Sequence, residues 1–280
     1  MKKISRRSFL AAAAVSAAAL ALTACGGSAS TASSAAASSV AASSEAASTS
    51  AAAADLTTVE AGKLTMATNA TFPPYEMTTD AGTIEGIDVD TAQAIAEKLG
   101  LELQIDDMDF DAALLSVQQG KADIAMAGIT VTDERMAVMS FSDSYATGIQ
   151  SIIVPNDSEI ASPDDLAGKK IGTQRGTTGY IYCSDDFGDE NVVAYDDGLT
   201  AVQALNNGQV DAVVIDNAPA QEFVAANPGL KVLDTSYAEE DYAIGMAKGS
   251  ALEDAVNKAL EELKADGTLQ AIVDKYINAN

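Results

Sequence analysis

One short pattern occurs twice in the chain, and this repeat constrains the fold more than any other feature. Residues 120–128 are GKADIAMAG, and residues 208–216, 88 positions later, are GQVDAVVID. In each copy a helical stretch ends at glycine, an aspartate follows three residues later, and an apolar strand comes next. A single repeat of this kind can also arise by chance. Otherwise it predicts two similar α/β lobes whose strand ends face a shared cleft, the place where open α/β sheets bind ligands.

Strands and helices alternate through the region around the first copy. Asp88 is predicted to be an N-cap, and Gly100 marks the end of the helix that follows. Strands are predicted at residues 63–68, 101–105 and 122–127, and helices at 88–99 and 111–119. This alternation predicts an α/β fold with mostly parallel sheets and helices on both faces.

The composition excludes several classes of function. Lys and Arg number 16 against 41 Asp and Glu, a formal charge of −25, which argues against a nucleic-acid partner. The absence of histidine excludes a Ser-His-Asp triad and the usual zinc sites. Cys25 and Cys183 are too few for a disulfide scaffold or a thiolate metal site. We therefore expect no metal and no cofactor.

Residues 1–24 are typical of an export signal peptide. They contain four basic residues and no acid, and the apolar run at 9–22 is too short to span a bilayer, which takes about 20 residues. Residues 5–10 (SRRSFL) resemble a twin-arginine export motif, although a general secretory signal accounts for them equally well. Both routes lead out of the cytoplasm.

The end of this segment, LTAC at residues 22–25, resembles the lipobox of bacterial lipoproteins. The resemblance implies cleavage before Cys25 and lipid attachment to its thiol, as with palmitate. The alternative is a core cysteine after an ordinary alanine-rich helix. Residues 26–54 are mostly alanine and serine, with Glu45 as the one charge, so they cannot bury enough apolar surface to fold. We expect residues 25–54 to be a disordered, lipidated tether that holds the folded module near a membrane.

Polar and aromatic residues follow the predicted strand ends. Two prolines in residues 69–76 (NATFPPYE) predict a rigid loop that carries Phe72 and Tyr75. After the strand at 122–127, Gly128 lets a ligand approach the backbone, and Arg135 offers a guanidinium that binds carboxylates. Arg135 is also compatible with a simple surface ion pair to a neighbouring acid.

Several ordered motifs resemble the polar amino-acid-binding proteins of ABC importers, the solute-binding proteins of family 3. They run in the family's order from about Lys63 to Tyr276. The motifs are AGITVTDER (127–135), FSD (141–143) with Tyr145, GIDVD (86–90), DLAGKKIG (165–172), GTT (176–178) and Asp216. The resemblance implies a type II periplasmic-binding-protein fold, with two α/β lobes joined by a two-strand hinge. Lobe 1 is then expected at residues 55–148, completed by 243–280, and lobe 2 at 149–242.

The resemblance also implies a role for each matching residue. Arg135, the backbone at Gly128 and the Thr130 hydroxyl would hold the α-carboxylate of a free amino acid, and Asp216 its α-ammonium. The remaining expected contacts are Phe72 and Phe110 around the aliphatic stem, Thr177 and Thr178 over the carboxylate, and Asn69 and Gln174 near the ligand side chain.

Each of these residues also has a purely structural interpretation. The two phenylalanines could belong to the core, residues 176–179 could form an ordinary turn, and Asp216 could cap a helix. Cys183 is expected to be a buried thiol. The neutral Asn69 and Gln174 favour an uncharged polar ligand such as glutamine, while Glu76 or Asp107 could supply a charge for a basic one.

The predicted function is therefore that of an extracytoplasmic, lipid-anchored binding protein. It would capture a polar amino acid by cleft closure and deliver it to an ABC permease, as a monomer and without catalysis. The first alternative is a secreted dehydratase of the prephenate or arogenate type on the same fold, with Asp216 as general acid. The second is a purely adhesive surface lipoprotein.

Overall fold

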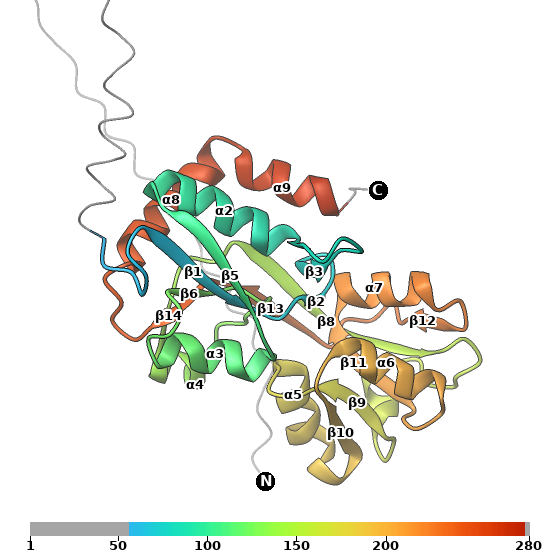
Figure 1. Ribbon diagram of the computed structural model, residues 1–280. Coiled ribbons are helices and arrows are strands. Elements are labelled where there is room, and N and C mark those ends of the chain that lie inside the picture. The colour runs from blue at the N-terminus through green and yellow to red at the C-terminus, as the bar shows by residue number, and fades with distance from the viewer. Residues whose placement is uncertain (1–55, 278–280) are drawn as a thin grey trace, which may run out of the picture. The chain divides into compact units, whose positions relative to one another are not determined.

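The computed structural model describes residues 56–277, and two large β-sheets organise this range (Figure 1). We call the part built on the first sheet the first lobe and the part built on the second sheet the second lobe. The predictions for the signal peptide, for Cys25 and for the tether lie outside the described residues.

The first sheet has five strands, and its β1 is parallel to both neighbours. In spatial order they are β5 (Glu102–Asp107), β1 (Lys63–Thr68), β6 (Ile124–Ala125), β14 (Gly245–Ala247) and β7 (Met139–Phe141). β1 has the predicted bounds, and five of its six residues are buried, as expected for a strand covered on both faces. β6 is shorter than the strand predicted at 122–127.

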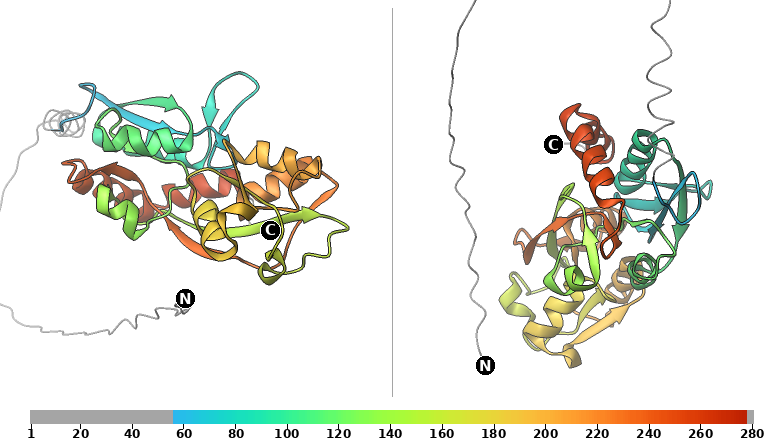
Figure 2. Two further views of the ribbon diagram at one scale, coloured as in Figure 1. Left: turned by 90° about the horizontal axis from the view of Figure 1, so that it is seen from below. Right: turned by 90° about the vertical axis from the view of Figure 1, so that its left-hand side faces the viewer.

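Helices cover both faces of this sheet. They are α2 (Ile87–Leu99), α3 (Phe110–Gln118), α4 (Asp133–Val138), α8 (Glu253–Ala265) and α9 (Thr268–Tyr276). Successive side chains of a strand point to opposite faces, so Met66 packs into the core beneath α2 and α8, while Ala67 packs against α3. The right-hand view of Figure 2 shows the red C-terminal helices beside the green α2. A small sheet adjoins this lobe: β2 (Thr71–Phe72), β3 (Glu76–Thr78) and β4 (Ile84–Glu85).

The second sheet has six strands. They are β10 (Val192–Tyr195), β9 (Ile171–Gln174), β11 (Ala212–Asp216), β8 (Ala146–Pro155) and β12 (Leu230–Val232), with β13 (Ala238–Tyr242) also paired to β8. Its helices are α5 (Thr178–Phe187), α6 (Gly198–Asn206) and α7 (Asn217–Ala226), and two 3₁₀ turns lie at Pro163–Leu166 and Asp189–Asn191. Cys183 is fully buried under this sheet with Ile152 and Val214, which confirms its prediction as a core thiol.

Two neighbouring strands connect the lobes. The chain leaves the first sheet after β7 and enters β8, and β13 leads back into β14. β8 and β13 pair in antiparallel fashion, from Ala146 opposite Tyr242 to Gln150 opposite Ala238. The predicted fold of two α/β lobes with a two-strand hinge is confirmed. The boundaries expected at residues 148 and 242 fall in these two strands, and they stay predictions.

The repeat found in the sequence is also a structural repeat. Gly120 follows α3 with φ 66°, and Gly208 follows α6 with φ 67°, a left-handed conformation that favours glycine. Each donates its N–H to the carbonyl three residues earlier, at 3.1 and 3.0 Å respectively. Asp123 and Asp211 then accept backbone N–H groups of their own lobes. The two copies therefore build the same turn before β6 and β11.

The beginning of α2 differs from the prediction. Gly86, not Asp88, is the N-cap, with φ 144°, and a Cβ there would lie 2.0 Å from the carbonyl oxygen of Tyr75. Asp88 instead sits in the first helical turn with its carboxylate turned into the protein. The predicted C-terminal glycine, Gly100, is present in the left-handed conformation.

Candidate ligand-binding site

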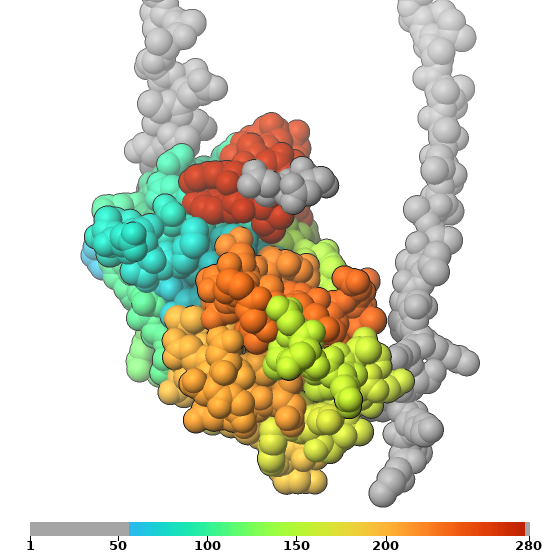
Figure 3. Space-filling view, turned by 90° about the vertical axis from the view of Figure 1, so that its right-hand side faces the viewer, coloured from blue at the N-terminus to red at the C-terminus, as the bar shows by residue number. Residues whose placement is uncertain are grey.

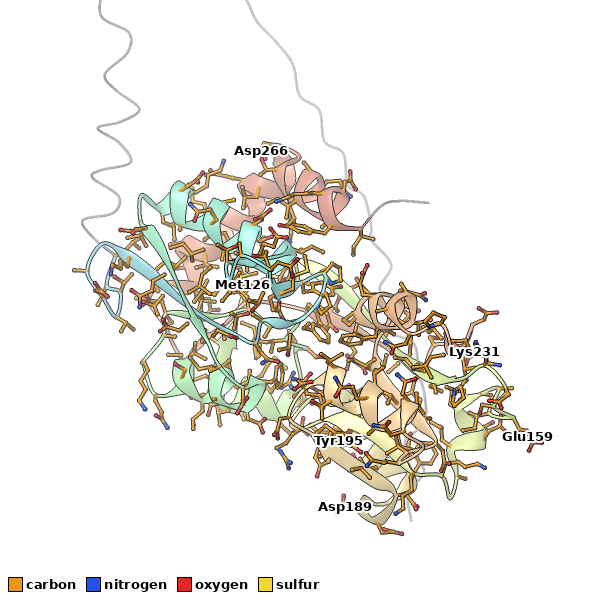
Figure 4. The ribbon with its side chains drawn as sticks, turned by 45° about the vertical axis from the view of Figure 1, so that its right-hand side comes forward. Met126, Glu159, Asp189, Tyr195, Lys231 and Asp266 are labelled. Carbon is orange, nitrogen blue, oxygen red and sulfur yellow. The ribbon has the colours of Figure 1, made fainter. Side chains whose placement is uncertain are left out.

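A cavity with about 20 Å³ of free volume lies between the two lobes. Figure 4 labels Met126 in the first lobe and Tyr195 in the second, and the cavity is lined by residues of both lobes. The structure brings all ten predicted ligand-binding residues into its wall: Asn69, Phe72, Phe110, Gly128, Thr130, Arg135, Gln174, Thr177, Thr178 and Asp216.

Arg135 is held by both lobes. Thr132 caps α4 by accepting the N–H of Arg135, as predicted, and this places the guanidinium at the cavity. Nη1 donates to the carbonyl of Thr130 at 2.8 Å, and Nη2 donates to the carbonyl of Gly176, in the second lobe, at 3.1 Å. The guanidinium also lies 5.4 Å from the centre of the Phe110 ring. No ion pair joins Arg135 to an acid within residues 56–277, so its charge is available to an anion.

Asp216 stands at the carboxyl end of β11 and caps α7. Its Oδ1 accepts the N–H of Ala218 at 3.0 Å, and its Oδ2 accepts the N–H of Ile149 at 2.7 Å. The side chain is therefore both the helix cap and part of the cavity wall. Burial raises the pKa of Asp216 to about 6, against the effect of the two N–H groups, so a cation beside it would favour the ionised form.

The two predicted aromatic residues differ in their surroundings. Phe72 stacks on Tyr75, with ring centroids 5.8 Å apart, and closes against Gly128, where an added Cβ would lie 2.8 Å from its ring. Phe110 begins α3 and packs into the core with Leu114 while it lines the cavity. Phe110 is therefore part of the core and part of the cavity wall at once, and its contact with a ligand stays a prediction.

The lobes also contact each other directly around the cavity (Figure 3 shows the cyan β2–β4 region against the orange second lobe). Gln174 donates from Nε2 to Oδ1 of Asn69 at 2.9 Å. The hydroxyls of Thr130 and Thr178 are 3.3 Å apart. The structure therefore has the two halves of the predicted site in contact across the cleft.

Two buried carboxyls belong to this region, Glu76 in the cavity wall and Asp88 next to it through Gly128. Asp88 accepts the Tyr145 hydroxyl at 2.7 Å and the Gly128 N–H at 3.1 Å. Because the Gly128 N–H is used in this way, Gly128 is left with its carbonyl for a ligand. Glu76 is fully buried and lines the cavity, and neither of its oxygens has a hydrogen-bond donor. Burial raises the pKa of Glu76 well above its usual value and that of Asp88 to about 6.

Comparison with known proteins identifies the family. Residues 64–279 match the model of the bacterial extracellular solute-binding proteins, family 3. The chain belongs to this family. It is therefore an extracellular solute-binding component of transport and not the dehydratase considered from the sequence. None of the helices within residues 56–277 is long and apolar enough to cross a membrane. In the same range no cluster of His, Cys, Asp and Glu side chains could hold a metal ion.

Individual relatives cover most of the chain. It is 32% identical to the L-cystine-binding protein TcyJ of Escherichia coli K12 over 225 residues, 79% of this chain and 85% of that protein. The structure of the arginine-, lysine-, histidine-binding protein ArtJ from Geobacillus stearothermophilus has a TM-score of 0.75 at 34% identity, covering 78% of this chain and 96% of that one. An ancestral arginine-binding protein bound to glutamine has a TM-score of 0.74 at 41% identity, covering 77% and 98%.

Some residues in the wall of this solute-binding protein were not identified from the sequence. Gln150 faces Asp216 across the β8–β11 ladder and donates to Glu240 at 2.9 Å. Tyr242, the last residue of β13, lines the cavity and is 1% exposed. Gln150 had a usable signal, since it is the longest polar side chain in a mostly apolar strand, whereas Tyr242 had no such signal. The other such wall residues are Ala127, Val214 and Ile215. Glu76 had been noted only as one possible source of charge.

Proposed function

We propose that this protein captures a free amino acid with a cationic side chain, of which arginine is the test case, and delivers it to an ABC permease. Two charged residues would recognise the part that all amino acids share. Arg135 would bind the α-carboxylate with the Thr130 hydroxyl, and Asp216 would bind the α-ammonium with the Gly128 carbonyl. Thr177 and Thr178 would complete the carboxylate site from the second lobe, and Phe72 and Phe110 would flank the aliphatic stem.

The two charges lie in different lobes, and this arrangement would couple binding to closure. In an open cleft water hydrates both groups, and closing it around unpaired charges costs several kcal/mol. A zwitterion supplies a partner for each of them. It would therefore bind the closed conformation more tightly and shift the population towards it.

The observation that supports a cationic side chain is the isolation of Glu76. This carboxyl is fully buried in the cavity wall and has no hydrogen-bond donor, whereas Asp216 has two backbone N–H groups. Once Arg135 and Asp216 are paired with the α-groups, Glu76 is the acid left to bind a third charge. Its match is a guanidinium or an ammonium. The predicted preference for an uncharged ligand rested on Asn69 and Gln174, and these two amides bond to each other.

The names of the relatives include binding proteins for cationic amino acids and for uncharged ones, so they do not decide the ligand class. The Bacillus subtilis protein ArtP, an arginine-binding extracellular protein, is 32% identical over 224 residues, 76% of this chain. ArtJ is described as binding arginine, lysine and histidine, and the ancestral protein was solved with glutamine.

We further propose that Cys25 carries a lipid and that residues 26–54 tether the module to the membrane. The basis is the export signal and the LTAC sequence. Membrane fractionation of the expressed protein tests this anchor. The Cys25→Ala variant should move the protein from the membrane fraction to the soluble fraction, and an unchanged distribution would refute lipidation.

Calorimetric titration tests the ligand class. Arginine and citrulline have nearly the same shape, but citrulline has no side-chain charge. At pH 7.5 we expect arginine to bind at least about tenfold more tightly than citrulline, since a hydrogen bond to a charged group contributes about 1.5–3 kcal/mol. The Glu76→Gln variant should lose this preference and keep citrulline binding. Equal affinities in the unaltered protein, or tighter binding of glutamine than of arginine, would refute the cationic assignment.

A further inference from the structure

Gln150 is a buried polar residue at the junction of three strands. It lies on β8, opposite Asp216 of β11 on one side and opposite Ala238 of β13 on the other. It lines the cavity and is 5% exposed. Because alternate residues of a strand point to the same face, Gln150 shares its face of the hinge with Glu240, which lies opposite Gly148. The hinge therefore carries a buried polar pair beside the cavity.

The two ends of the Gln150 amide contact two different elements. Nε2 donates to Oε2 of Glu240 at 2.9 Å. An ionised carboxylate accepts hydrogen bonds and donates none, so this contact fixes which end of the amide is the NH₂ group. The other end, Oε1, lies against the first turn of α5, where a Cβ added at Gly179 would be 2.8 Å from it. The side chain thus spans the space between β13 and α5.

Gly179 allows α5 to approach the hinge this closely. Its backbone is not in the left-handed region, so a side chain at this position is opposed by contact alone. An added Cβ would also lie 3.4 Å from the carbonyl oxygen of Val214 on β11. Thr177, the N-cap of α5, and Thr178 precede Gly179 in the same turn. The contact with Gln150 therefore sets the distance between the hinge and the turn that carries these two threonines.

Glu240 keeps the Gln150 amide in this orientation. It is 6% exposed, and among residues 56–277 Gln150 is the one donor to its carboxylate, whose Oε1 has no partner. A buried carboxylate without any donor is costly, so the amide cannot turn away from it freely. Glu240 also acts on Arg135, because its charge opposes the lowering of the Arg135 pKa by burial. The hydrogen bond and the charge of Glu240 are therefore separate effects.

We propose that Gln150, held by Glu240, positions the first turn of α5 for binding of the ligand's α-carboxylate. It acts through Thr178, whose hydroxyl is 3.3 Å from that of Thr130 where the lobes meet. This inference rests on the proposed function, in which Thr177 and Thr178 complete the carboxylate site. Gln150 is then a positioning residue, and it changes the affinity without having to touch the ligand.

This role differs from the one proposed for Glu76. Every amino acid has the α-carboxylate, so a change at Gln150 should weaken binding of arginine and of citrulline by the same factor. A change at Glu76 should instead alter the ratio of the two affinities. The ratio therefore separates a residue that positions the carboxylate site from one that binds the ligand side chain.

The test is calorimetric titration of arginine and citrulline on the full protein and on three variants. Gln150→Ala removes the contact, and Gly179→Ala adds a methyl group that strikes the Gln150 amide. Each single variant should lower both affinities by about tenfold and leave their ratio unchanged. In the double variant the methyl group has no amide to strike, so Gly179→Ala should cause little further loss. A purely structural role would lower the melting temperature and leave the affinities of the folded protein unchanged.

Variants of β13 separate the hydrogen bond from the charge. Glu240→Ala should lower both affinities as Gln150→Ala does. Glu240→Gln should restore most of this loss, because its side-chain oxygen can still accept from Gln150. The matched control is Glu239→Ala, which removes an exposed acid from the same strand and should change neither affinity.

Three results would overturn the positioning role. They are unchanged affinities or a changed ratio in Gln150→Ala, strictly additive losses in the double variant, and an equal loss in Glu240→Ala and Glu240→Gln. Citrulline binding as tight as arginine binding in the unaltered protein would instead refute the proposed cationic ligand. The test of Gln150 would still hold in that case, since either amino acid reports on the α-carboxylate site.

Discussion

Gln174 in the second lobe donates a hydrogen bond of 2.9 Å to Asn69 in the first lobe, although 105 positions separate them in the chain. Both side chains are buried at the cleft, at 4% and 6% exposure respectively. The two residues expected to face the ligand side chain therefore also link the lobes to each other. Because this contact joins the two lobes across the cleft, it stabilises the conformation in which they touch.

The Asn69–Gln174 contact can be tested by a double-mutant cycle. Each single substitution, Asn69→Ala or Gln174→Ala, should weaken amino-acid binding because it destabilises the closed form. The double variant should bind more weakly than either single variant. Its loss of binding free energy should be smaller than the sum of the two single losses, by a coupling of about 0.5–1.5 kcal/mol for one hydrogen bond. Isothermal titration of all four proteins measures this coupling. Strictly additive effects would mean that the two amides act independently.

Arg135 is predicted to be essential for binding. Its guanidinium is the charge placed to meet a carboxylate, and Arg135→Ala should lower amino-acid affinity by at least about 100-fold, the loss expected for a buried charged contact. Arg135→Lys should recover little of it, since an ammonium lacks the planar fork. Because Arg135 also bonds Thr130 and Gly176, the alanine variant should melt at a lower temperature even without ligand.

Arg175 provides the matched control for this experiment. It is another arginine beside the cleft, but its side chain is 56% exposed and pairs with Asp196 at 3.8 Å. Arg175→Ala should leave affinity and melting temperature nearly unchanged. An equal loss of affinity in the two alanine variants would indicate a general effect of charge and not a specific contact.

Gly148 is predicted to be intolerant of a side chain although it lies outside the cavity wall. A Cβ on this β8 residue would lie 2.4 Å from the ring of Tyr242, and that ring also packs edge-on against Tyr75 at 5.5 Å. Gly148→Ala should therefore displace Tyr242, reduce stability by about 1–3 kcal/mol and weaken ligand binding. Gly229→Ala, where an added Cβ meets nothing within 4 Å, should change neither. Chemical denaturation and titration of both variants give the comparison.

Stability of the ligand-free protein should increase as the pH falls from 7.5 to 5. Burial raises the pKa of Asp88 and of Asp216 to about 6 from 3.8, so the folded state binds more protons than the unfolded chain in this window. The free energy of unfolding should increase by about 1–3 kcal/mol in total over this window. Once the pH is below the unfolded-state pKa of these two groups, they should not increase it further. Urea unfolding at several pH values measures the trend. A fall in stability between pH 7.5 and 5 would contradict the assigned burial of these carboxyls.

Some features of the site were predictable because they depend on local chemistry. Thr132 before two acids predicts a helix start, and the structure has that cap. Asp216 at the end of an apolar strand was expected to be a helix cap or a ligand contact, and it caps α7 in the cavity wall. Asp88 was expected to cap α2 as well, but Gly86 begins the helix and frees the carboxylate for Tyr145 and Gly128. A capping residue type does not reveal which way its side chain turns.

The amino-acid sequence by itself determined the two-lobe α/β architecture, because strand periodicity and glycine stops are local properties of the chain. The ten residues that line the cleft followed from the resemblance of its ordered motifs to family 3. The tertiary structure alone decided that Glu76 lacks any donor, that Asp88 accepts the Tyr145 hydroxyl and the Gly128 N–H, and that Asn69 meets Gln174. Whether a carboxyl is paired, protonated or free depends on burial and on neighbours brought together from distant segments. Those distances exist only once the chain has folded.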